Sequence, residues 1–221
     1  MCDAENQQTM QRGMNFRMNP AYSVILMSQR FNAPYSDRVH GDGITIEYEG
    51  HDVSKRKLEL NHNPKTEDQP EKLPSGRLTQ NGHFIKAVKD YKKSKNKPEL
   101  IKVYEKILPG TWSLKGYFDL IDYKVAHDGK RNVFRFFLKL SDREENSKIN
   151  TKTHEHNRLI PSVVKREVWK RDQGKCVLCG DSKNLHFDHD LPFSRGGTSL
   201  SANNVRLLCM THNLKKSDKI E

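Results

Sequence analysis

The residues that decide the fold of the C-terminal part are Cys176-Val177-Leu178-Cys179 and, further along, Cys209-Met210-Thr211-His212. Each pair places two metal-binding side chains three positions apart, and two such pairs close one tetrahedral zinc site. The sequence therefore predicts a structural Zn²⁺ held by Cys176, Cys179, Cys209 and His212. A module this small can hardly bury a sufficient core alone, so metal binding would supply part of its folding free energy. Buried thiols or a redox pair are the alternative.

The segment between the two pairs carries a second pattern of polar residues. It reads Asp188-His189-Asp190-Leu191-Pro192-Phe193-Ser194-Arg195-Gly196-Gly197, and Asn204 precedes Leu207-Leu208-Cys209. With Asn213 and Lys216 after the second pair, residues 161–219 resemble the HNH endonucleases. In that family a two-stranded ribbon and a helix surround a catalytic divalent ion, an arrangement called the ββα-metal fold.

This resemblance implies a role for each matching residue. Asp188 and Asn213 are expected to bind a catalytic Mg²⁺ or Mn²⁺, ions that prefer oxygen ligands. His189 is expected to be the general base that takes a proton from water, because a neutral imidazole titrates near working pH. Asn204 matches the asparagine that holds the hairpin and helps to orient the histidine. His212, assigned to zinc, is an alternative to Asn213 in the catalytic role.

Three neighbouring residues have both a functional and a plainer interpretation. His186 contacts the site or is a surface residue of the strand. Asp190 joins Asp188 or is a solvated carboxylate, and we favour the second because Pro192 interrupts the strand. Arg195, beside two glycines, contacts a phosphate or belongs to an ordinary turn.

The rest of the chain predicts a second, β-rich domain. Hydrophobic patterning predicts strands over 21–27, 44–49 and 100–104, a helix over 83–91, and a hairpin of 117–125 with 133–140 around Asp128-Gly129. We expect a flexible N-terminal arm (1–18), a recognition domain (19–141), a polar linker (142–160) and the HNH module (161–221). The module should open with a helix over 163–171 that Ser162 caps and whose Val164 and Val168 face the core.

Several motifs in residues 20–140 resemble the SRA family, whose domains flip a modified cytosine out of duplex DNA. They are Tyr48-Glu49-Gly50-His51-Asp52, Asp68-Gln69 followed by Asn81-Gly82, and Gly116, the one residue kept from the family's Tyr-Asp-Gly. The resemblance implies an α+β chain whose SRA-like domain is a PUA-like barrel. It also implies that Tyr35 and Tyr48 stack on the extruded base while Asp37 reads its edge; a strand aromatic and a turn carboxylate are the plainer interpretations.

The formal net charge of +11 and the pI near 9.4 favour a polyanionic partner. An anionic membrane surface is the rival, but the sequence has neither an apolar run of membrane-spanning length nor a basic amphipathic helix. A group of basic residues is expected to contact the DNA backbone or to be plain surface charge: Arg30, Arg38, Lys55, Arg56 and Lys57.

The N-terminus lacks a signal-peptide pattern, and Cys2 stands apart from the other cysteines, so we expect a cytoplasmic protein. The two resemblances imply a bacterial or phage-related origin.

Together the two resemblances predict a modification-dependent restriction endonuclease. It would bind double-stranded DNA containing 5-methylcytosine or 5-hydroxymethylcytosine and hydrolyse a nearby phosphodiester. One HNH site cuts one strand, so a double-strand break calls for a homodimer or for two nicks. The rivals are an HNH nuclease indifferent to modification and a non-cleaving reader of modified DNA.

Overall fold

The computed structural model of the chain describes residues 1–58, 63–94, 97–143, 159–191 and 197–216. The chain divides into two compact units, Met1–Ser147 and Lys148–Glu221, here called the sheet unit and the hairpin unit. Most of the linker expected over 142–160, and Arg195 with it, lies outside the described residues. No helix in the described ranges is long and apolar enough to cross a membrane.

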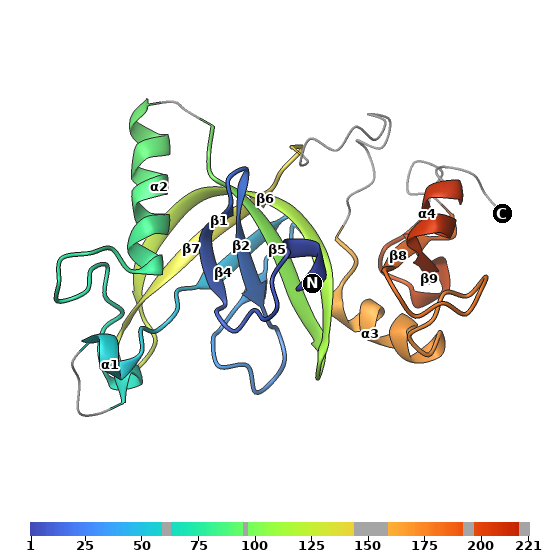
Figure 1. The fold of residues 1–221 in the computed structure, drawn as a ribbon, viewed down its shortest axis with the longest axis horizontal. Helices are drawn as coiled ribbons and strands as arrows, with labels where there is room; N and C mark the ends of the chain where they lie inside the picture. The colour runs from blue at the N-terminus through green and yellow to red at the C-terminus, as the bar shows by residue number, and fades with distance from the viewer. Residues whose placement is uncertain (59–62, 95–96, 144–158, 192–196, 217–221) are drawn as a thin grey trace. The chain divides into compact units, whose positions relative to one another are not determined.

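The sheet unit is built on one seven-stranded sheet with the order β1-β2-β5-β6-β7-β4-β3 (Figure 1). Its strands are β1 (Met14–Asn19), β2 (Tyr22–Met27), β3 (Arg38–Val39), β4 (Thr45–Glu49), β5 (Leu100–Leu108), β6 (Thr111–His127) and β7 (Asn132–Leu140). All neighbouring pairs are antiparallel except β2 with β5. Strands β1 and β3 stand at the two ends of this order, and the described strands form one mixed sheet; the PUA-like barrel that the resemblance implies stays a prediction.

The long strand β6 bends where its pairing with β5 shifts register, between Val103 and Tyr104. Gly116 lies opposite this shift with a φ of 140°, a conformation that residues with a Cβ rarely adopt. The one residue retained from the Tyr-Asp-Gly motif therefore has a backbone reason to be glycine.

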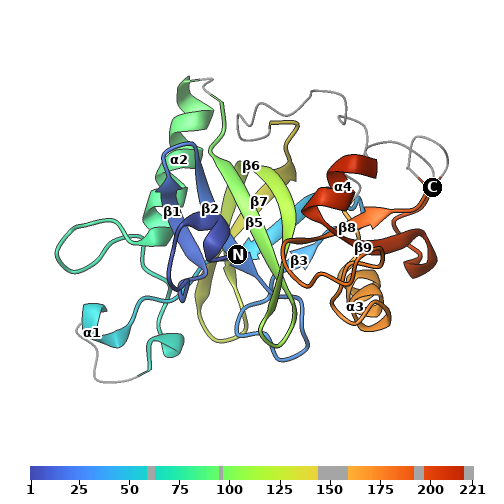
Figure 2. The same ribbon diagram turned by 45° about the vertical axis from the view of Figure 1, so that its right-hand side comes forward.

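Helix α2 (Gln80–Ser94) covers part of the sheet and packs against β1 and β6 (Figure 2). It buries Phe84, Ile85 and Val88, and begins three residues before the predicted start. The earlier start follows from Thr79, whose hydroxyl accepts a hydrogen bond from the Gly82 amide at 3.1 Å and so caps the first turn. The unit also contains α1 (Lys55–Leu58) and two 3-10 turns, Asp3–Glu5 and Pro64–Thr66.

The predicted strands over 21–27, 44–49 and 100–104 and the hairpin around Asp128-Gly129 are confirmed as β2, β4, β5 and β6–β7. The separate arm expected over 1–18 is wrong, because β1 pairs with β2. Sequence patterning missed β1 because Arg17, with a φ of 44°, interrupts its alternation.

Glu5 also ties the beginning of the chain to the sheet unit. Its buried carboxylate accepts hydrogen bonds from the hydroxyls of Tyr22 (2.9 Å) and Tyr104 (2.6 Å) and pairs with Lys102 at 2.8 Å. These partners satisfy a charge that would otherwise be costly to bury.

The hairpin unit contains α3 (Ser162–Arg171), the antiparallel strands β8 (Leu185–His189) and β9 (Val205–Cys209), a 3-10 turn (Ala202–Asn204) and α4 (Met210–Lys216). Its apolar core consists of Ile160, Val164, Val168, Ala202, Val205 and Leu207, which confirms the predicted valine stripe. Ser162 is the first residue of α3 and not its cap. Pro161 occupies the cap position, without a side-chain hydrogen bond, because a proline fits the start of a helix where no amide partner is needed.

Candidate metal centre and ligand cavity

The four predicted zinc ligands converge in the hairpin unit. The donor atoms of Cys176, Cys179, Cys209 and His212 all lie within 4.8 Å of one another. The Sγ atoms of Cys179 and Cys209 are 3.8 Å apart, and His212 Nδ1 lies 3.5 Å from Cys176 Sγ and 3.2 Å from Cys209 Sγ. Tetrahedral Zn²⁺ with Zn–S near 2.3 Å requires ligand separations of about 3.5–3.8 Å, so this donor set fits zinc.

Local structure explains why the four ligands meet. The Gly180 amide donates to the Cys176 carbonyl, and Gly180 has a φ of 76°, so the first pair sits in a tight turn. The second pair spans the end of β9 and the first turn of α4. The Val177 amide donates to the Leu207 carbonyl and holds the turn against β9.

Asp188 and His189 lie at the end of β8, next to α4. The buried ammonium of Lys216 contacts the Asp188 carboxylate and the His189 carbonyl. His189 Nε2 lies 2.9 Å from Ser199 Oγ, a contact that orients the imidazole. Lys216 belongs to the motif that carried the resemblance but received no role from it, and Ser199 was missed because nothing in its local sequence distinguishes it.

Asn204 fastens the two sides of the loop that follows β8. Its Oδ1 accepts from the Leu191 amide at 2.8 Å, and its Nδ2 donates to the carbonyls of Leu191 and Thr198, each at 3.1 Å. Gly197 approaches this crossing so closely that a Cβ there would lie 1.8 Å from the Leu191 oxygen. These hydrogen bonds are of the kind expected from an asparagine that holds the hairpin.

The described residues do not gather a second metal site around Asp188. The Asp188 carboxylate contacts Lys216, and Asn213 lies one helical turn before Lys216 on α4. His186 is exposed, and Asp190 pairs with Arg206 at 2.7 Å, so it is an ion-paired carboxylate and not simply a solvated one. The Lys216 ammonium lies where the expected divalent ion would contact the Asp188 carboxylate. With Lys216 in this position, the described residues around Asp188 do not form a site that fits this ion.

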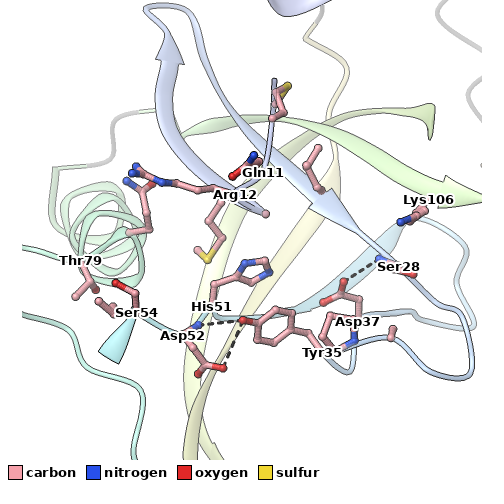
Figure 3. Close-up of a pocket in the computed structure, with 18 of the residues that line it drawn as sticks. Gln11, Arg12, Ser28, Tyr35, Asp37, His51, Asp52, Ser54, Thr79 and Lys106 are labelled. Carbon is pink, nitrogen blue, oxygen red and sulfur yellow. Dashed lines mark hydrogen bonds between the residues drawn. The ribbon is translucent and has the colours of Figure 1, made fainter. Parts of the chain in front are cut away.

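The sheet unit has a cavity of about 620 Å³ that collects residues from segments far apart in the sequence (Figure 3). Residues of the segments 10–14, 26–37, 51–57, 73–80 and 106–112 line it. The volume is in the range of small-molecule sites, and a single nucleobase is small by comparison. Two predicted pocket residues, Tyr35 and Asp37, line the cavity; the third, Tyr48, does not.

Asp37 is a partly buried residue whose carboxyl group lies in the cavity wall. Its Oδ2 accepts from the Ser28 amide at 3.0 Å and its Oδ1 from the Glu49 amide at 3.1 Å, which closes the loop of residues 28–37 onto β4. Burial raises the pKa of Asp37 to about 7, although the two amides oppose the rise. Asp37 can therefore present either an ionised or a neutral carboxyl group near neutral pH.

Tyr48 is buried and does not line the cavity, so its expected role as a stacking surface stays a prediction. The ring next to the cavity is that of His51, which stacks on Tyr35 with ring centroids 4.0 Å apart and planes 15° apart. Its centroid is 5.5 Å from that of Tyr48, with planes 19° apart. Sequence patterning missed His51, although it is the middle residue between Gly50 and Asp52 of a quoted motif.

Basic and apolar side chains surround the cavity. Four basic residues line it, namely Arg12, Arg30, Lys57 and Lys106. Arg56 and Arg77 line a smaller hollow of about 410 Å³ that shares Lys57 with it. Arg38 instead pairs with Glu47 at 2.9 Å. Phe31, on the same loop as Arg30 and Tyr35, is fully exposed to solvent.

Solved structures similar to this chain include SRA domains. The SUVH5 SRA domain in complex with fully methylated CG DNA is 14% identical at a TM-score of 0.41, covering 62% of this chain and 79% of that one. The same domain bound to fully hydroxymethylated CG DNA is 13% identical at a TM-score of 0.40, covering 64% and 82%. Arabidopsis thaliana SUVH6 in complex with SAM is 12% identical at 0.37, covering 83% and 28%.

No family model and no curated protein matches the chain.

Proposed function

We propose that this protein is a modification-dependent DNA endonuclease. The sheet unit would take a flipped 5-methylcytosine or 5-hydroxymethylcytosine into its cavity, and the hairpin unit would hydrolyse a phosphodiester of the same DNA. The observation that carries the proposal is the cavity, where an aromatic ring, Tyr35, and a partly buried carboxyl group, Asp37, meet inside a basic rim.

A flipped base needs an aromatic surface to stack on and a polar group that reads its Watson–Crick edge. Cytosine presents an amino donor at N4 and an acceptor at N3. The neutral form of Asp37 offers a carbonyl acceptor and a hydroxyl donor in the complementary order, and its raised pKa keeps that form populated near pH 7. Asp37 is therefore suited to read cytosine.

The rim of the cavity is suited to the DNA on either side of the base. Arg12, Arg30, Lys57 and Lys106 carry positive charge where phosphates would pass, in agreement with the net charge of +11. The exposed Phe31 is suited to enter the duplex at the place that the base leaves, as apolar wedges do in other DNA-bending proteins.

For the hairpin unit the proposal rests on Asp188, His189 and Asn204. His189 would accept the proton of the attacking water, with its ring oriented by Ser199. Asn204 would keep the loop after β8 in place. A divalent ion at Asp188 would stabilise the charge on the leaving oxygen, and Asp188 with Asn213 would hold it.

A digest of one DNA fragment in three forms tests the proposal: unmodified, with 5-methylcytosine and with 5-hydroxymethylcytosine. Each form is incubated with Mg²⁺ or Mn²⁺ and the native protein, His189→Ala or the control His186→Ala. We expect cutting of modified DNA only, lost in His189→Ala and kept in His186→Ala. Equal cutting of all three forms would support a nuclease indifferent to modification. Whether one or two copies act is read from analytical ultracentrifugation on and off DNA.

One contact favours a second candidate, a reader of modified DNA that does not cut. The Asp188 carboxylate is already paired with the Lys216 ammonium, the arrangement expected of a site that binds no divalent ion. Preferential binding of modified DNA without cutting by any metal-supplemented sample would select this candidate.

A further inference from the structure

The stacking position beside Tyr35 is already filled by a side chain of the protein. The His51 ring lies parallel against one face of Tyr35, with ring centroids 4.0 Å apart. Figure 3 shows the imidazole over the tyrosine ring inside the cavity. A base cannot stack on this face of Tyr35 until the imidazole moves.

His51 is held as a nucleobase would be held. Its flat ring stacks on Tyr35, and its edge meets the hydroxyl of Tyr48, whose ring plane is tilted 19° from its own. Its Nε2 lies 2.8 Å from the Tyr48 hydroxyl, which also lies 2.9 Å from the Gly13 carbonyl. The hydroxyl can donate to that carbonyl while accepting from Nε2–H of His51.

Gly13 shows how closely the slot fits a flat ring. A Cβ on Gly13 would lie 1.7 Å from Cε1 of His51, so the Gly13 backbone touches the ring edge. Any side chain at this position would occupy the space that the imidazole fills. The φ of Gly13 is not in the left-handed region, so space and not backbone conformation is what calls for glycine here.

The backbone of His51 is anchored while its side chain lines the cavity. The His51 amide donates to Asn81 Oδ1 at 3.1 Å, and Asn81 Nδ2 donates to the His51 carbonyl at 2.9 Å. Rotation about the side-chain bonds would therefore move the ring toward the cavity without disturbing β4 or α2. The cavity of about 620 Å³ next to the ring has room to receive it.

We propose that His51 is a plug that occupies the stacking position on Tyr35 and swings out when a flipped cytosine enters. The proposal rests on the proposed function of the cavity. The free protein thereby keeps this face of Tyr35 covered, and only a base whose binding outweighs displacement of the plug takes its place. His51 would then set the threshold for accepting a base.

The direct test is NMR of the full chain carrying His189→Ala, which prevents cutting, with histidines labelled at Cε1. The His51 signal is assigned by its loss in His51→Ala. In the free protein it should be shifted upfield by the Tyr35 ring on which it stacks, and a saturating duplex with 5-methylcytosine should move it toward the position of an exposed histidine. An unmoved signal in the saturated complex would overturn the proposal.

Affinity measurements supply a second test in the same background. His51→Ala empties the slot, so binding of the modified duplex should tighten by roughly 10-fold if the plug leaves the slot about a tenth of the time unaided. Gly13→Ala puts a methyl group into the slot and should weaken the same binding. The control His83→Ala removes an imidazole that stacks on Phe16 outside the cavity and should change nothing.

The outcomes separate the plug from the function on which it rests. Equal affinity of the native protein for modified and unmodified duplexes would end the proposed function, and the plug with it. A clear preference for modified DNA that His51→Ala weakens as strongly as Tyr35→Ala would keep the function and overturn the plug, because His51 would then be part of the binding surface.

Discussion

The sheet unit and the hairpin unit obtain their stability from different sources. The sheet unit has a seven-stranded sheet, the buried helix face of Phe84, Ile85 and Val88, and enclosed ion pairs such as Lys115 with Glu105 at 2.8 Å. The hairpin unit has one small apolar cluster and a group of three cysteines and a histidine. The first can fold on burial of apolar surface, whereas the second needs a further source of free energy.

The same difference separates how their sites are assembled. In the hairpin unit, Asp188, His189 and Asn204 come from one hairpin and the turn before its second strand. In the sheet unit, the cavity joins residues as distant as Arg12 and Lys106. The geometry of the hairpin site depends on the conformation of one hairpin and its turn. The geometry of the cavity depends on the pairing of the whole sheet.

The largest effect expected from this contrast is on metal removal. Cys209→Ser should abolish zinc binding and unfold the hairpin unit while the sheet unit stays folded, because only the former relies on the metal. Zinc per chain is measured by mass spectrometry. Folding is followed by Trp169 fluorescence in a Trp112→Phe background, which leaves Trp169 as the remaining tryptophan. Cys2→Ser, at the one cysteine outside the cluster, is the control, and loss of the sheet unit in Cys209→Ser would refute the contrast.

A second prediction tests whether the hairpin site depends only on residues of the hairpin and its adjoining turn. Asn204→Ala removes three hydrogen bonds across the loop after β8 and should reduce cutting of modified DNA by roughly 100-fold or more, because His189 would no longer be held in place as the acid–base group. Zinc content and DNA affinity should not change. The neighbour Asn203, which is exposed, gives the matched control Asn203→Ala. Native cutting rates in Asn204→Ala would show that the loop does not depend on this residue.

A third prediction concerns the distributed site of the sheet unit. Phe31→Ala should weaken binding of a modified duplex by about 10-fold, because the gap left by the flipped base would lose an apolar filler of one to a few kcal/mol. Pairing the modified cytosine with a mismatched base should recover part of the loss, since the base then leaves the duplex more easily. Leu114→Ala, at another exposed apolar residue, is the control. Unaltered affinity in Phe31→Ala would remove the wedge from the proposal.

A fourth prediction concerns the pH dependence of the sheet unit's stability. The pKa of Asp37 is about 7 in the folded chain and near its ordinary value, about 4, when unfolded, so between these values the folded state holds a proton that the unfolded state has lost. The free energy of unfolding should therefore fall as pH rises from about 4 to about 7, by an amount on the order of 1–4 kcal/mol. Glu49 and Arg135 are the charged groups that act on Asp37 in opposite directions.

Urea unfolding at several pH values measures this fall in the native chain and in Asp37→Asn, where it should be absent. Asp42→Asn is the control, because the exposed Asp42 has its pKa lowered by Thr45 and should leave the fall in place. A fall of the same size in Asp37→Asn would assign the proton to another group.

The sequence predicted what depends on local spacing. Cys176, Cys179, Cys209 and His212 were placed together because each pair fixes its own geometry within one turn. The strands with regular alternation, such as Thr45–Glu49, were also predicted. Lys216 against Asp188 and Ser199 against His189 were not, because those contacts depend on how α4 and the loop return to β8.

The cavity could be predicted only in part. Tyr35 and Asp37 were placed in it by resemblance, but Tyr48 was expected at its surface and lies beneath His51. Whether Tyr48 of β4 or His51, which follows the strand, faces the cavity depends on packing against distant backbone, here that of Gly13 and Leu26. No pattern within β4 contains that information.

The pairing of Glu5 with Tyr104 joins residues 99 positions apart, and it has a consequence for synthesis on the ribosome. At roughly 5–20 residues per second, the first strands wait for on the order of ten seconds before β5 is made, and only then can β2 pair with it. During that time the segment Tyr22–Met27, buried along its whole length in the finished fold, has no parallel neighbour. The nascent chain is thus most prone to aggregation early, and slower initiation or chaperone binding to this segment should raise the yield of folded protein.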